Sequence, residues 1–118
     1  MKITWSLILA ILTLAMGPGS SLAEDRLSFF EKRIRPLLVD HCQECHGSDQ
    51  QEGKLRLDSM AGWKRGGKTG PAIVPGDPSS SLLVKAISYQ DDRLTMPPDK
   101  KDQLSKQQVE DIITWIRQ

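Results

Sequence analysis

The sequence predicts a small all-α domain of three to four short helices joined by long loops. Two apolar stripes with helical spacing support this prediction, one shortly after the N-terminal segment and one at the end of the chain. Between them lies a stretch rich in glycine and proline, a composition that favours loops. The sequence contains neither an alternating strand–helix pattern nor an internal repeat.

The first predicted helix begins at Ser28. Ser28 and Glu31 have the spacing of a capping box, in which the two side chains satisfy free backbone N–H groups at a helix start. The apolar stripe that follows consists of Phe30, Ile34, Leu37 and Leu38. Pro36 lacks a backbone N–H and interrupts this stripe, so we expect a kink near Arg35.

Residues 47–77 are predicted to be loop, because they contain seven of the nine glycines of the chain. The Leu55-Arg56-Leu57 alternation within them is too short to predict a strand. Bare loops of this length are uncommon in compact domains unless they surround something functional. A bound group beside this stretch would explain it.

Two further helices are predicted after the loop. Asp77 is a cap followed by Pro78 at the first helical position, and the short helix that follows ends near Ser88. The last helix begins with a second capping box, formed by Ser105 and Gln108. Its apolar stripe consists of Val109, Ile112, Ile113 and Ile116.

Residues 1–23 have the features of a secretory signal peptide. Lys2 precedes an uncharged apolar run from Ile3 to Met16, and Ser21-Leu22-Ala23 places small residues where a signal peptidase reads the chain. We therefore expect cleavage after Ala23, a domain of residues 24–118, and a periplasmic or otherwise exported location. The alternative is a retained membrane anchor, but the apolar run is short for a span of about 20 residues.

The composition of the predicted mature domain excludes one class of function and suggests a bound group. Lys2 is the only charged residue of the signal segment, so 15 basic and 15 acidic residues remain. This balance argues against nucleic-acid binding, which requires a basic excess. About a third of the mature residues are hydrophobic, which makes a thin core for a domain of this size.

Residues 41–47 read HCQECHG and contain both cysteines and both histidines of the chain. An exported pair of cysteines first suggests a disulfide, but a loop as short as Cys42–Cys45 adds little stability. A thioredoxin-type dithiol would require a βαβ context. A structural zinc site would require four ligands, and no further cysteine or histidine exists beyond this stretch.

The arrangement CxxCH is the attachment signature of a c-type haem. On one helical turn Cys42, Cys45 and His46 share a face, so two thiols can bond to the porphyrin vinyl groups while the imidazole ligates the iron. We predict one covalent haem c per chain, with His46 as the proximal ligand. His41 lies on the opposite side of the turn and is expected at the haem edge or in solvent.

Met96 is the predicted distal ligand of the iron. Methionine opposite histidine is a common ligand pair in electron carriers and raises the reduction potential. Pro97 and Pro98 follow Met96 and favour a stiff extended loop, which would hold a thioether at a fixed distance. Met60, the other methionine of the predicted mature chain, is expected to have a packing role.

Taken in order, these features resemble a class I cytochrome c, and their finer pattern is similar to the planctomycete-type cytochrome c domain. The matching segments are IRPLL, CQECHG, GKLRLDS, GPAIVPGDPSSSLL, MPP and a terminal WI. The resemblance covers nearly all of residues 28–118. It implies a class I cytochrome c-like fold in which Cys42 and Cys45 form thioether links and His46 and Met96 are the axial ligands.

The resemblance also implies contacts around the haem. A carbonyl at the Gly70-Pro71 step would accept the imidazole N–H of His46, and Ile73 and Val74 would pack against the porphyrin. The expected function is one-electron transfer rather than catalysis, in service of a separate redox enzyme. Its expected partners are an electron donor and an electron acceptor, with no nucleic acid and no small-molecule substrate. Membrane association is expected only if the signal segment is retained.

Two other functions are compatible with the motif. A haem sensor or peroxidase-like protein would use the same CxxCH but would keep the sixth iron position open. A secreted interaction module without cofactor would use Cys42 and Cys45 as a disulfide. Met96 in a stiff loop argues against the first alternative, and the thin apolar core argues against the second.

Overall fold

The structure is a computed structural model that describes residues 19–118, so most of the predicted signal segment lies outside the described residues. The described part is mostly helical and contains no strand; its only β pairings are two isolated bridges, His46 with Gln51 and Gly67 with Gly70. This confirms the predicted all-α, loop-rich fold. No helix in this part of the chain has the length and apolar character needed to cross a bilayer.

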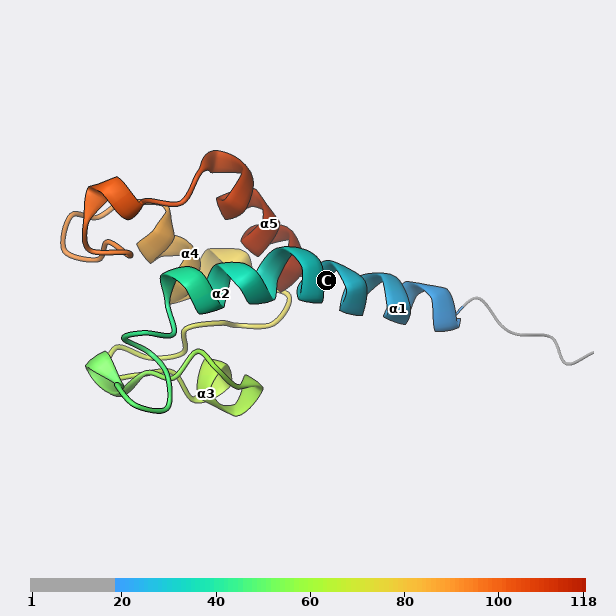
Figure 1. Cartoon of the computed structure of the whole chain (residues 1–118), viewed down its shortest axis with the longest axis horizontal. Helices are drawn as coiled ribbons and strands as arrows, with labels where there is room; N and C mark the ends of the chain where they lie inside the picture. Colours follow the sequence, from blue (N-terminus) through green and yellow to red (C-terminus); the bar gives the residue numbers. More distant parts are fainter. Residues whose placement is uncertain (1–18) are drawn as a thin grey trace, which may run out of the picture.

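The described part of the chain begins with one continuous helical segment rather than with a helix that starts at Ser28. Helix α1 (Gly19–Phe29) passes through a π-helical turn, η1 (Phe30–Ile34), into helix α2 (Arg35–His41). In Figure 1, α1 extends away from the other helices, whereas α2 runs between them. The predicted cap at Ser28 is therefore wrong, because the backbone is already helical nine residues earlier.

Pro36 explains the π-helical turn. Its missing N–H and its ring are incompatible with regular α-helical bonding one turn earlier. The backbone widens ahead of it, and the N–H of Arg35 donates to the carbonyl of Phe30, five residues back. The irregularity expected near Arg35 is thus present as a wide turn.

Helix α5 (Lys106–Arg117) closes the domain and begins as predicted. The Ser105 hydroxyl accepts from the Gln108 N–H at 3.2 Å, and the Gln108 side chain accepts from the Ser105 N–H at 2.8 Å. A partly buried ion pair then attaches α5 to the N-terminal helical segment, since Arg33 Nη2 lies 2.7 Å from Asp111 Oδ2. The π-helical turn η1 and the last helix are therefore packed together.

Residues 47–77 contain more structure than the sequence predicted. A 3₁₀ turn, η2 (Glu52–Lys54), is followed by helix α3 (Met60–Arg65), which the Ser59 hydroxyl caps by accepting from the Gly62 N–H at 3.1 Å. The indole of Trp63 in α3 packs against Phe30 and Trp115, with ring centroids 5.0 to 5.8 Å apart. These tertiary contacts stabilise a helix whose glycine content alone argued for loop.

Residues 77–88 form the predicted helix in two pieces. Asp77 caps a 3₁₀ turn, η3 (Pro78–Ser80), and helix α4 (Leu82–Ile87) follows after Ser81. The Ser81 hydroxyl is fully buried and binds backbone groups of the preceding loop, including the Val74 N–H at 2.9 Å. A last 3₁₀ turn, η4 (Lys100–Asp102), connects to α5.

The hydrophobic core lies where α2, α4 and α5 meet (Figure 1). Its most deeply buried apolar side chains are Ile34, Leu38, Ile87 and Ile112. Next to this core, the loops of residues 42–57 and 66–72, the Met96 loop and α4 enclose an apolar space. The core residues Leu57, Ala72 and Leu83 also line it.

Candidate haem-binding site

A cavity of about 340 Å³ brings together the predicted thiols, the imidazole and the thioether. Cys42, Cys45, His46 and Met96 all line it, although Met96 is far from the other three in sequence. The rest of its lining is mainly apolar and includes Leu55, Leu57, Leu82, Leu83, Ala86 and Leu94. An apolar cavity with a few convergent polar groups is typical of a cofactor site.

The CxxCH motif forms a separate turn directly after α2. The helix ends at His41, and the N–H groups of Cys42 and Gln43 both donate to the Leu38 carbonyl, at 3.1 and 2.9 Å. The N–H of His46 then donates to the Cys42 carbonyl at 2.9 Å. This four-residue spacing is that of a helical turn, so the motif has the local geometry that its sequence predicts.

Two bonds attach this turn to the following loop. The Cys45 carbonyl accepts from the Glu52 N–H at 2.9 Å, and the His46 carbonyl accepts from the Leu57 N–H at 2.7 Å. Gly47 allows the backbone to pass close to the turn, because a Cβ atom at this position would lie 2.4 Å from the Gln43 carbonyl oxygen. The backbone on both sides of His46 is therefore fixed.

Both cysteines are free thiols, and Cys42 is the more buried of the two. Burial, together with a smaller contribution from the neighbouring Cys45, raises the pKa of Cys42 to about 11. A redox-active dithiol generally has one cysteine with a lowered pKa, because the thiolate is the nucleophile. Cys42 is therefore poorly suited to be the nucleophile of such a centre.

The imidazole of His46 contains a buried atom that lacks a partner within the described part of the chain. Its Nδ1 is inaccessible to solvent and makes no hydrogen bond there. A buried polar atom without a partner is costly, so the described part of the chain leaves this imidazole incompletely satisfied. The carbonyl contact expected from the Gly70-Pro71 step is thus not formed in this structure.

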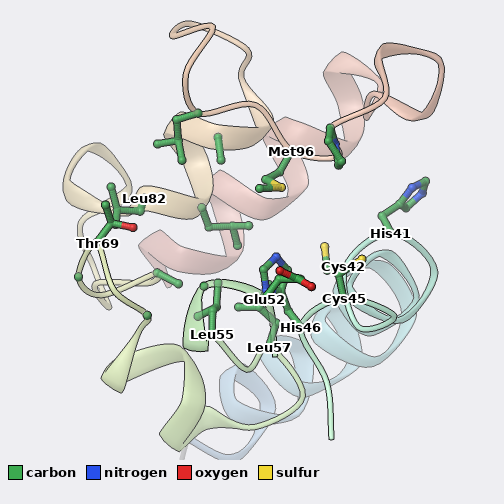
Figure 2. A pocket seen from close by; sticks show the side chains of 18 residues that line it. His41, Cys42, Cys45, His46, Glu52, Leu55, Leu57, Thr69, Leu82 and Met96 are labelled. Atoms are coloured by element: carbon green, nitrogen blue, oxygen red, sulfur yellow. The ribbon is translucent and has the colours of Figure 1, made fainter. Parts of the chain in front are cut away.

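Met96 lies across the cavity from His46. Figure 2 shows its sulfur and the His46 ring on opposite sides of the same space, with the two cysteine sulfurs at one edge. The N–H of Met96 donates to the Ala86 carbonyl at 3.1 Å, which attaches the loop to α4. Met60 instead begins α3, is 60% exposed and is not among the residues that line the cavity.

Pro71 and Ile73 do not line the cavity. Pro71 is exposed, and Ile73 is 5% exposed and belongs to the hydrophobic core. Their neighbours Gly70 and Ala72 face the cavity instead. Successive residues of an extended segment point to opposite sides. A prediction that is shifted by one residue therefore assigns the core-facing residues of this segment to the cavity.

Several cavity residues were not selected from the sequence. Leu55 and Leu57 both line the cavity, and their alternation with Arg56 was a usable signal that they share a side. Glu52 and Thr69 had no such signal, because the folding of distant loops brings them there. His41 lies at the rim and points away from His46 in Figure 2, in agreement with the expected edge position.

The features described fit a haem. The buried unpartnered imidazole nitrogen, the facing thioether, the two adjacent thiols and the apolar walls are what such a group requires of a protein. This combination is typical of c-type cytochromes.

The comparison with protein families supports the same class. The family model described as Planctomycete cytochrome C matches residues 42–100, a range that begins with the first cysteine of the motif and includes Met96. The chain belongs to the planctomycete cytochrome c family. Neither a curated protein nor a solved structure gives a significant match.

Proposed function

We propose that the protein is an exported one-electron carrier. Cys42 and Cys45 would hold haem c through thioether bonds, with His46 and Met96 as axial ligands of the iron. When bound, the haem would supply one-electron chemistry between Fe(III) and Fe(II). The observation that carries the proposal is the convergence of these four side chains on one apolar cavity.

The residues of the chain have three tasks in this proposal. The hydrogen-bonded turn of residues 42–46 would hold the proximal imidazole on a short, rigid backbone. The leucines of the cavity would exclude water, and a low dielectric around the haem is one determinant of its potential. Met96 would close the sixth position, which leaves no iron site for a substrate.

The two alternative functions fit these observations less well. A sensor or peroxidase-like protein needs an accessible sixth position, but Met96 faces His46 across the cavity. A cofactor-free module would leave the buried Nδ1 of His46 and the apolar walls without a role. The electron donor and acceptor would be separate redox proteins, and we propose no enzymatic activity for this chain alone.

The sixth ligand provides a direct test of the proposal. Oxidised protein matured in a periplasm should show the weak near-infrared charge-transfer band of a thioether–iron bond. Met96→Ala should abolish this band because it removes the sulfur. Met60→Ala, which removes a sulfur outside the cavity, should leave the band intact. A band that survives Met96→Ala would contradict the proposed ligand.

A further inference from the structure

The loop that carries Met96 has few attachments to the rest of the domain. Gln90, Asp91, Asp92 and Arg93 are exposed, and Met96 itself is 37% exposed. Within this loop the N–H of Leu94 donates to the Asp91 carbonyl at 2.9 Å, which is a local turn. A loop with so few contacts needs specific anchors if it is to hold a side chain at a fixed place.

Tyr89 is the only tyrosine of the chain, and its backbone is unusual. It lies directly after the C-cap of α4 and has a φ of 53°, in the left-handed region that bulky side chains rarely adopt. Such strain persists only where the surrounding structure maintains it. Its hydroxyl donates to the carbonyl of Pro97, so the strained turn aims the side chain at the Met96 loop.

Two hydrogen bonds therefore flank Met96; one partner, Ala86, lies in the last turn of α4 and the other, Tyr89, follows the C-cap of that helix. On one side, the N–H of Met96 donates to the Ala86 carbonyl at 3.1 Å. On the other, the next residue in the chain, Pro97, accepts from the Tyr89 hydroxyl. Together these bonds fix the backbone before and after the thioether side chain.

We propose that Tyr89 is a positioning residue that holds Met96 against the iron. This inference rests on the proposed function, because it assumes that Met96 is the distal ligand. Tyr89 does not line the cavity, so it would act only through the backbone of the loop. Loss of its hydroxyl would let the loop open more often and would expose the sixth position to external ligands.

Tyr89→Phe tests the inference because it keeps the ring and removes only the hydroxyl. Ser88→Ala is the matched control: it removes a neighbouring hydroxyl that donates to the Val84 carbonyl at 2.6 Å, within α4. The measurement is titration of the oxidised holoprotein with imidazole, which competes with the thioether for iron. We expect Tyr89→Phe to bind imidazole roughly 3- to 10-fold more tightly than wild type, the effect of one hydrogen bond. Ser88→Ala should bind it as wild type does.

Amide hydrogen exchange of the holoprotein gives a second readout, which does not depend on an added ligand. Tyr89→Phe should speed exchange at the Met96 N–H and leave α5 unchanged. Unchanged imidazole affinity and unchanged exchange in Tyr89→Phe, or equal changes in Ser88→Ala, would overturn the role of Tyr89 while leaving Met96 as ligand. A wild-type protein without the near-infrared thioether band would overturn both proposals.

Discussion

At the scale of single residues, the CxxCH motif depends on backbone geometry as well as on its reactive side chains. Residues 42–46 form a turn, closed by the bond from the His46 N–H to the Cys42 carbonyl. The His46 carbonyl then accepts from the Leu57 N–H, so the chain must change direction directly after His46. Gly47 makes this change of direction possible, since no side chain fits between its Cα and the Gln43 carbonyl. The glycine after the histidine is therefore part of the site.

Gly47→Ala should distort the turn that holds His46. The added Cβ would meet backbone rather than a movable side chain, with a separation of 2.4 Å before any shift. We expect a loss of about 1–3 kcal/mol in unfolding free energy, the usual cost of overpacking. Denaturant unfolding of the holoprotein measures this loss.

Ser48→Ala is the control for this substitution, because Ser48 is exposed and its hydroxyl donates to the adjacent Asp49 carboxylate at 3.1 Å. Its unfolding free energy should stay within about 0.5 kcal/mol of wild type. If Gly47→Ala were equally stable, the turn would have room that the structure does not show.

At the scale of elements, local signals predicted helix starts well where no distant contact competes. The Ser105–Gln108 capping box and the Asp77 cap are both present. The Ser28–Glu31 pair has the same sequence pattern but lies inside a continuous helix, where Glu31 instead binds Arg35 at 2.6 Å. A capping pattern indicates that a helix can begin at that position. Whether a helix does begin there depends on whether the residues before it are already helical.

The cap at Asp77 predicts a dependence of stability on pH. Hydrogen bonds from Ser79 and Ser80 hold the pKa of Asp77 at about 2, below the ordinary value of 3.8. A carboxyl with a lowered pKa stabilises the fold above its unfolded-state pKa. This stability is lost as the pH falls from about 4 through about 2.

Asp77→Asn should therefore flatten the fall in stability between pH 4 and pH 2, because the amide keeps an acceptor for the cap but does not titrate. Unfolding followed at several pH values in this window measures the slope. Asp92→Asn is the comparison, since no hydrogen bond to its side chain is found in the described part of the chain and its slope should match wild type. Equal slopes in Asp77→Asn and wild type would contradict the role of the cap.

At the scale of the whole molecule, the residues with reactive side chains that line the cavity were predicted more accurately from the sequence than the residues around them. Thiols, an imidazole and a thioether in this pattern are compatible with few functions, so their common location could be predicted. The four residues that carry them, Cys42, Cys45, His46 and Met96, do line one cavity. Pro71 and Ile73 have no such restriction, and the structure places the cavity against Gly70 and Ala72 instead. Helix α3 was missed because Trp63 is stabilised by Phe30 and Trp115, which are distant in sequence.

The convergence of these four residues on one cavity predicts that the proposed haem contributes to folding. The core is small, and the cavity beside it needs a large apolar group to complete the packing. Cys42→Ser with Cys45→Ser removes both attachment points, so the double variant should be digested by protease much faster than the wild-type holoprotein. A double variant as resistant as wild type would favour the cofactor-free module.

The mass of the denatured chain tests whether haem is covalently attached to Cys42 and Cys45. Protein co-expressed with a periplasmic haem-maturation system is denatured, freed of non-covalent groups and weighed by mass spectrometry, beside the Cys42→Ser, Cys45→Ser variant. We predict that the wild-type chain keeps the added mass of one haem and that the variant keeps none. A wild-type chain with no added mass, or one lighter by the two hydrogens of a Cys42–Cys45 disulfide, would contradict the account.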